Sequence, residues 1–217
     1  MENIKNKKNY CTIYIVRHGE TEWNVKKIMQ GHKDSKLTKK GINQAKDTAK
    51  RLKKIKFDKV FSSDLGRAKK TAEILALEHK LIVKTHKALR ERSFGKYDGQ
   101  KLKKFQEELK ELLQKFEDLN DQEKFKYKMP YDNKSWEDII TRFITILREI
   151  AVAYPNKKIL VVSHGGVIKF FLIHLGFATT KQLGWHAIKN TAHVKLLCDG
   201  VDFFIKETFG VHKQEAK

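Results

Sequence analysis

The sequence predicts a three-layer α/β/α fold with a mainly parallel central sheet, one antiparallel edge strand and a helical insert as a cap. Short apolar runs with the composition of strands alternate with segments whose apolar residues recur at helical spacing. This alternation is typical of a parallel sheet with helices on both faces. Near the end of the chain, two strand-like runs flank Asp199-Gly200, a pair that favours a hairpin. A hairpin requires an antiparallel strand at one edge of the sheet.

The first half of the chain is predicted to form three strands and two helices. Residues 12–17 are a β-branched apolar run, which is typical of a buried strand. Thr38 is a candidate N-cap for a helix that ends near Lys54, because apolar residues follow it at helical spacing. The next expected elements are a strand over 59–62, a helix over 65–78 and a short strand over 81–83.

The second half is predicted to form a long charged helix and then the rest of the sheet. Residues 101–126 carry an apolar stripe and are expected to form one amphipathic helix. Ser135 opens another helix with Asp138 three residues later, as in a capping box, and Pro155 ends it near Tyr154. The last expected elements are a strand over 158–163, a helix over 166–174, and strands over 193–198 and 203–206.

The chain length predicts how these elements are organised. A chain of 217 residues is long enough to bury the core of one domain. We therefore expect a single domain over 1–217, whose core is formed by about 12–100 and 135–210. The stretch of about 100–134 is the one candidate insert, and it lies where a cap over a substrate is commonly added.

Composition favours a cytoplasmic protein that binds an anionic small molecule. The formal net charge of +20 comes mainly from lysines spread along the chain. We interpret them as solvated helix faces that also attract anionic substrates, with a dedicated polyanion surface as the alternative. The polar N-terminus lacks a signal-peptide pattern, and no apolar run is long enough to span a bilayer. Cys11 and Cys198 form neither a metal-ligand spacing nor a disulfide framework. We expect no membrane partner and no specific nucleic acid, and the oligomeric state is left open.

Two histidines follow two of the expected strands. Arg17 and His18 come directly after the apolar run of residues 12–16, and His164 comes directly after the strand over 158–163. Ligands of open α/β sheets bind at the carboxyl ends of the strands, so we expect these side chains to converge there. Two imidazoles beside an arginine indicate an anionic substrate, most simply a phosphate.

Further residues extend this candidate phosphate site. Arg67 falls in the first turn of a predicted helix, and a guanidinium matches phosphate oxygens in a bidentate manner. A neutral imidazole such as that of His18 is a competent nucleophile. Glu91, in the loop after the third strand, is a candidate proton donor for the leaving oxygen. Backbone N–H groups of Gly165 and Gly166, at a helix start, would add an anion site.

Several segments in register resemble the histidine phosphatase superfamily, the phosphoglycerate mutase-like proteins. The resemblance covers roughly residues 12–100 and 135–195, which is most of the chain. The matching segments are Arg17-His18-Gly19-Glu20-Thr21-Glu22-Trp23-Asn24, Gln30-Gly31, Leu37-Thr38-Lys39-Lys40-Gly41, Ser62-Ser63-Asp64-Leu65-Gly66-Arg67-Ala68, Glu91 with Phe94-Gly95, and Ser163-His164-Gly165-Gly166.

The resemblance implies a role for each matching residue. His18 would be the nucleophile that becomes phosphohistidine, and Glu91 would be the proton donor and then the base that activates water. Thr21 and Gln30 would lie at the substrate mouth. The residues implied to bind the phosphoryl group are Arg17, Asn24, Arg67, His164 and the Gly165 N–H.

The implied activity is that of a metal-independent phosphomonoesterase acting on small phosphorylated metabolites, with no cofactor. In enzyme terms this is a phosphoric monoester hydrolase of the histidine acid phosphatase type. Two alternatives stay open: a 2,3-bisphosphoglycerate-dependent phosphoglycerate mutase, and a polyanion-binding module on a degenerate phosphatase fold. The chain lacks the paired arginines and long insert expected of cofactor-dependent mutases, which favours the phosphatase.

Two features of the sequence depart from the family pattern or complicate it. Lys134 stands where the phosphatase branch often carries a glutamate, and we expect it at the edge of the pocket. Arg90 and Arg92 flank Glu91, where close contact would favour the ionised carboxylate.

Overall fold

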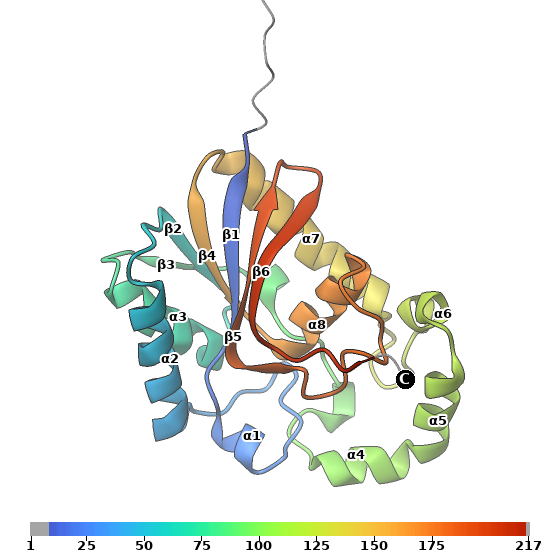
Figure 1. Cartoon of the computed structure of the whole chain (residues 1–217). Helices are drawn as coiled ribbons and strands as arrows, with labels where there is room; N and C mark the ends of the chain where they lie inside the picture. Colours follow the sequence, from blue (N-terminus) through green and yellow to red (C-terminus); the bar gives the residue numbers. More distant parts are fainter. Residues whose placement is uncertain (1–8, 216–217) are drawn as a thin grey trace, which may run out of the picture.

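The computed structural model describes residues 9–215 and contains one six-stranded sheet (Figure 1). The prediction that the N-terminus lacks a signal-peptide pattern concerns residues 1–8, which lie outside the described residues. In sheet order the strands are β3 (Val83–Thr85), β2 (Lys59–Ser62), β4 (Lys158–Ser163), β1 (Cys11–Arg17), β5 (Ile188–Cys198) and β6 (Phe203–Val211). The pairs among β3, β2, β4 and β1 are parallel, whereas β1–β5 and β5–β6 are antiparallel. The mixed α/β class is confirmed. The strand that runs against the others is β5, one place in from the edge strand β6.

Both faces of the sheet are covered at β1, which explains why the sequence of this strand is almost continuously apolar. Ile13 and Ile15 belong to the hydrophobic core on one face, while Tyr14 and Val16 belong to the core on the other. Successive side chains of a strand point to opposite faces, so a strand covered on both sides carries apolar residues at every position.

Two pairs of helices supply this cover (Figure 1). On one face lie α2 (Lys39–Leu52) and α3 (Gly66–Leu77), and on the other lie α7 (Trp136–Ala153) and α8 (Gly165–His174). Thr38 caps α2 by accepting a hydrogen bond from the Gly41 N–H, as its side-chain chemistry predicts. Ser135 and Asp138 form the predicted capping box of α7.

Three strands differ in extent from the sequence prediction. The strand expected at 81–83 is β3 at Val83–Thr85, because the end of α3 turns through Lys80 (φ 53°) and the Leu81 N–H still donates to Ala76. Both late strands are longer than predicted. A register shift between Ile188 and His193 interrupts the period-two pattern from which strand length is inferred.

The single helix expected over 101–126 is wrong: this segment forms three helices. They are α4 (Leu102–Glu108), α5 (Lys110–Asp118) and α6 (Asp121–Lys126). The chain bends at Leu109, and Asn120 caps α6 with a capping box. The bend allows Phe105 to pack with Met29 and Phe94 while Phe116 packs against Trp136 in a separate core.

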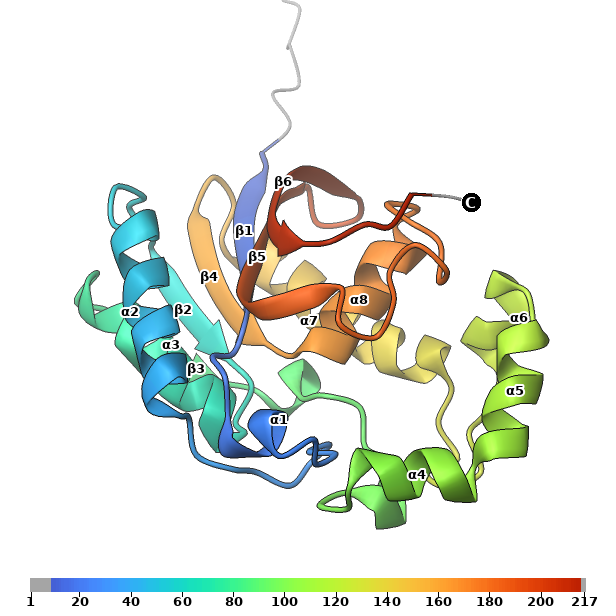
Figure 2. The ribbon, with the colours of Figure 1, turned by 60° about the horizontal axis from the view of Figure 1, so that its bottom comes forward.

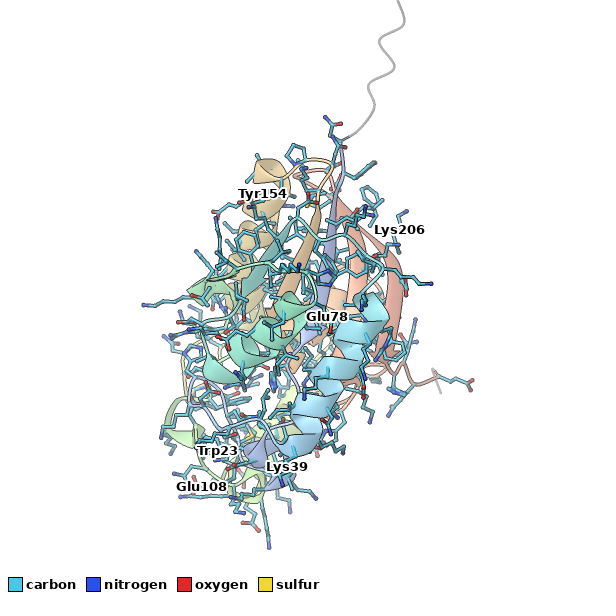
Figure 3. The ribbon with its side chains drawn as sticks, turned by 90° about the vertical axis from the view of Figure 1, so that its left-hand side faces the viewer. Trp23, Lys39, Glu78, Glu108, Tyr154 and Lys206 are labelled. Carbon is cyan, nitrogen blue, oxygen red and sulfur yellow. The ribbon has the colours of Figure 1, made fainter. Side chains whose placement is uncertain are left out.

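The helices of this insert lie beside the carboxyl ends of the parallel strands. Figure 2 shows them as a curved row that starts near the short helix α1 (Glu22–Val25) and runs towards α7 and α8. In Figure 3, Trp23, Lys39 and Glu108 lie at one end of the molecule and Tyr154 at the other. Two 3₁₀ turns, η1 (Lys87–Leu89) and η2 (Gly95–Tyr97), complete the elements. Among the described residues, no helix is long and apolar enough to cross a membrane.

Candidate active site

The carboxyl ends of β1 and β4 bring the two predicted histidines together. Arg17 of β1 pairs with Ser163 of β4, so the next residue of each strand, His18 and His164, leaves the sheet at the same level. Their ring centroids are 5.3 Å apart in an edge-to-face arrangement. Both side chains are buried.

The hydrogen bond of His18 fixes which ring nitrogen can act as a nucleophile. Its Nδ1 lies 2.8 Å from the Gly19 carbonyl oxygen, which can only accept, so Nδ1 carries the proton. The lone pair is therefore on Nε2. Burial lowers the pKa of His18 well below 6.5, and the charges of Arg67 and Arg17 lower it further. The imidazole is uncharged at neutral pH.

His164 is held in a similar state. Burial is the main cause that lowers its pKa well below 6.5, followed by the charge of Arg67. Neither of its ring nitrogens has a hydrogen-bond partner within residues 9–215. A buried imidazole without partners retains a donor and an acceptor for a bound group.

Arg17 lies against the start of α8. A Cβ on Gly165 would lie 3.0 Å from the Arg17 Nε, so a larger residue there would crowd the guanidinium. The Arg17 Nη1 donates to the Ile188 carbonyl, whereas its Nε is buried with no partner in the described chain. Burial lowers the pKa of Arg17 to about 10, which leaves the guanidinium charged at neutral pH.

Arg67 is buried at the start of α3, its side chain only 1% exposed. Its Nη1 donates to the Lys33 carbonyl (2.8 Å) and to Asp34 Oδ1 (3.0 Å), and its Nη2 donates to the Gly31 carbonyl (2.8 Å). Burial lowers its pKa, and the charge of Asp34 opposes that effect. These contacts hold a cation beside the two histidines.

Glu91 caps the start of α8. One carboxylate oxygen accepts the Gly166 N–H (2.9 Å), and the other accepts the N–H groups of Val167 (3.1 Å) and Arg92 (2.9 Å). The expectation that the Gly166 N–H binds the substrate anion is therefore wrong, because Glu91 occupies it. A Cβ on Gly166 would meet Glu91 Oε1 at 2.6 Å.

The arginines that flank Glu91 bind elsewhere. Arg90 forms a bidentate ion pair with Asp64, at 2.7 and 2.6 Å, and Arg92 Nη2 donates to the Tyr131 hydroxyl. Within the described chain neither arginine forms an ion pair with Glu91. The charge of Glu91 nevertheless acts on the Arg92 guanidinium.

Most of these groups line one cavity of about 1080 Å³ between the sheet end and the insert, whereas His164 lies behind His18 and is not among its lining residues. The predicted site residues among its lining are Arg17, His18, Asn24, Gln30, Arg67, Glu91 and Gly165. Ten lysines and arginines line it, against three glutamates. The charge of the lining suits an anionic ligand. No cluster of three or more His, Cys, Asp or Glu side chains arranged for a metal occurs between residues 9 and 215.

Comparison with known proteins agrees with this geometry. The sequence pattern of the histidine phosphatase superfamily (branch 1) matches residues 13–209. The chain belongs to the histidine phosphatase superfamily. Enzymes of this superfamily act through a phosphohistidine intermediate.

Three relatives illustrate the similarity. Phosphoglycerate mutase-like protein 4 of Arabidopsis thaliana is 37% identical over 163 residues, which cover 74% of this chain and 69% of that protein. Metal-independent phosphoserine phosphatase of the same plant is 31% identical over 198 residues, covering 89% and 81%. The structure of phosphoserine phosphatase from Entamoeba histolytica with 3-phosphoglyceric acid aligns with a TM-score of 0.72 at 26% identity, covering 91% and 96%.

Two predicted residues of this histidine phosphatase lie elsewhere than expected. Thr21 is fully buried as the N-cap of α1, where it accepts the Asn24 N–H and donates to Asn24 Oδ1, so its expected place at the substrate mouth is wrong. Lys134 is exposed and is not among the residues that line the cavity, so its expected place at the pocket edge is also wrong. It follows a tight turn in which Asn133 has φ 52° and the Lys134 N–H bonds to Asp132.

The sequence interpretation missed two residues that hold the histidine phosphatase site together. Arg142 of α7 donates to the carbonyls of Ala88, Arg90 and Glu91 at 2.6–2.9 Å, which fixes the loop that carries Glu91. Asn190 Nδ2 donates to the His18 carbonyl at 3.1 Å. Neither lies next to a motif. The one local signal is that Arg142 lies in a mainly apolar stretch of α7, where a charged residue indicates a specific partner.

Proposed function

We propose that this histidine phosphatase is a metal-independent phosphomonoesterase that hydrolyses small phosphorylated metabolites through a phosphohistidine at His18. One observation carries the proposal. The buried, uncharged imidazole of His18 has its lone pair on Nε2 and lines a cavity that also contains Arg17 and Arg67.

In the first step, His18 Nε2 attacks phosphorus and the bond from phosphorus to the ester oxygen breaks. Glu91 gives a proton to the departing oxygen, so an alcohol leaves. The remaining phosphoryl oxygens are bound by Arg17, Arg67 and His164, together with Asn24 and the Gly165 N–H.

In the second step, water attacks the phosphohistidine. Glu91 accepts a proton from that water, the phosphorus–nitrogen bond breaks, and His18 is regenerated as inorganic phosphate leaves. The arginines supply the positive charge that balances the phosphoryl oxygens in both steps.

Several observations support the substrate class and the finer enzyme type. The name of the Arabidopsis relative, metal-independent phosphoserine phosphatase, supports a small phosphorylated substrate. We assign residues of about 100–134 as a cap on a single domain, since α4 to α6 line the cavity. The histidine acid phosphatase type and a cytoplasmic location are part of this proposal, and the two free, buried cysteines are consistent with that location.

A mutase would use the same phosphohistidine and return the phosphoryl group to a second position of the acid. The matched relatives with phosphatase names make the mutase the less favoured reading. A polyanion-binding module would bind nucleic acid with a steep salt dependence, and would gain nothing from a neutral His18 in the same cavity as Glu91.

The test is phosphate release from a panel of phosphomonoesters that includes 3-phosphoglycerate, with EDTA present. We expect release by the wild type and a loss of at least ~1,000-fold in His18→Ala, as for other removed nucleophiles. His212→Ala, at an exposed histidine, is the matched control. Full release by His18→Ala would make the mechanism wrong. Isomerisation of 3-phosphoglycerate faster than phosphate release would make the enzyme a mutase.

A further inference from the structure

A second group of cations lies in the same cavity and takes no part in the proposed chemistry. Lys169 of α8 and Lys124 of α6 line the cavity together with Arg92. The charges of Arg92 and Lys124 act on Lys169, so the three groups are close enough to repel one another. We refer to Lys124 and Lys169 as the lysine pair.

The geometry of α8 relates the lysine pair to the phosphoryl site. Gly165 and Gly166 form the first turn, where they meet Arg17 and Glu91. Lys169 follows three and four residues later, and residues at these spacings lie on one face of a helix. The rise of 1.5 Å per residue puts its Cα about 6 Å from that of Gly165 along the axis. Helical side chains lean towards the N-terminus, which brings the Lys169 ammonium nearer to the phosphoryl site.

The positive charge of the lysine pair is only weakly compensated within the protein. Lys124 is 1% exposed, and its Nζ lies 3.3 Å from Glu117 Oε2, whose side chain is 73% exposed and therefore shared with solvent. Lys169 forms no hydrogen bond and no ion pair among the residues that the structure describes. Burial lowers the pKa of Lys169 to about 8, the Glu117 charge opposes this, and Arg92 and Lys124 add to it.

Aromatic rings form part of the same cavity, and the Lys124 Nζ lies 5.8 Å from the centre of the Phe116 ring. Trp136 and Phe170 stack with ring centroids 4.2 Å apart, and Phe116 packs edge-on against Trp136. All three rings line the cavity. Such walls keep water away and strengthen the attraction between a cation and an anion placed beside it.

We propose that the lysine pair binds a second acidic group, a carboxylate or another phosphate, of the ester whose phosphoryl group lies at His18. This inference rests on the proposed phosphatase function and narrows its substrate class. The substrates are small phosphomonoesters that carry a second acidic group close to the phosphoryl group.

The test compares esters that differ only in the second acid. The carboxylate arm pairs 3-phosphonooxypropanoate with propyl phosphate, and the phosphate arm pairs propane-1,3-diol bisphosphate with 3-hydroxypropyl phosphate. The readout is the ratio of kcat/KM within each pair. We expect the wild type to favour the acid at least ~10-fold in one arm, a factor typical of a charge-assisted contact. That arm identifies the second group.

Lys169→Met and Lys124→Met should each bring this ratio close to one. Lys126→Met is the matched control, because Lys126 is an exposed residue of the same helix as Lys124 and does not line the cavity. It removes the same charge and should leave the ratio unchanged. The lysine pair comes from two helices, so one variant still decides the question if the other fails to fold.

The outcomes separate the two proposals. No acid preference in the wild type, or a preference that both lysine variants retain, overturns the lysine-pair inference and leaves the phosphatase function in place. An equal loss in Lys126→Met also overturns it, because net charge alone would then be the cause. Absence of phosphate release from all four esters overturns the phosphatase function and the inference with it.

Discussion

At the level of single residues, the chemistry depends on the charge and tautomer of His18. Burial and two neighbouring guanidinium groups lower its pKa well below 6.5. A base is protonated below its pKa, so His18 keeps its lone pair as the pH falls through 6.5, where an ordinary histidine loses it. We expect a ¹⁵N NMR titration to show Nδ1 protonated and Nε2 bare at pH 7.5 and still so when the pH has fallen to 6.5. A midpoint at or above pH 6.5 would contradict this.

Gly166 is expected to matter for the rate and little for stability. An added Cβ would overlap Glu91 Oε1, which is the end of a flexible side chain and can move aside. Gly166→Ala should therefore displace the proton donor, with a fall in kcat of at least ~10-fold, since such groups contribute ~100-fold or more. Steady-state kinetics and thermal unfolding measure the two effects. Gly184→Ala is the control, because only the end of Gln214 lies near that Cβ. An unchanged kcat would remove Glu91 from the mechanism.

Sequence reasoning performed differently for different residues of the site. Arg17, His18 and His164 were predictable because each lies at the carboxyl end of a strand, and the ends of parallel strands meet at one edge of the sheet. Thr21 was misplaced because a motif shows which residues are near a site without showing which of them point into it. Asn24 both lines the cavity and bonds to Thr21, and these two roles could be recognised only in the folded turn, not in the sequence. The contact between Gly166 and Glu91 joins distant segments and has no local signal.

At the level of elements, local signals predicted the helices and strands of the core. The caps at Thr38 and Ser135 are encoded within four residues, and both occur as predicted. The insert was not predictable in the same way. The periodicity over 101–126 fits a single helix, and its division into three depends on two separate aromatic clusters at its two ends.

The loop that carries Glu91 depends on one side chain of α7. Arg142 donates to three carbonyls of that loop, and hydrogen bonds to a charged group contribute ~1.5–3 kcal/mol. We expect Arg142→Met to lower the free energy of unfolding by about 2–3 kcal/mol and to reduce phosphate release, because Glu91 loses its support. Urea unfolding measures the first effect. Arg148→Met, at an exposed arginine of the same helix with one carbonyl partner, should cost less than ~1 kcal/mol. Equal losses in the two variants would show that Arg142 has no special role.

At the level of the whole molecule, the net charge of +20 and the cationic cavity act on the approach of the substrate. Salt shortens the range of this attraction from ~30 Å at 0.01 M to ~6–8 Å above 0.15 M. We expect kcat/KM for a doubly acidic ester to fall several-fold between about 10 and about 300 mM NaCl, because the attraction is screened at the higher salt concentration. The change in kcat should be smaller. Steady-state kinetics at both salt concentrations provide the check. If kcat/KM does not change with salt, the excess of lysines does not contribute to substrate capture.

The position of β1 in the sheet has a consequence for synthesis of the protein. β1 leaves the ribosome before the other five strands of this sheet, yet its two neighbours are β4 and β5. Arg17 and His18 therefore emerge early and must wait for His164 and Asn190 before their surroundings exist. A nascent or truncated chain that ends before β5 holds the nucleophile without the groups that orient it. Because of this order of strands, we expect no phosphatase activity before β4 and β5 have been synthesised and paired with β1.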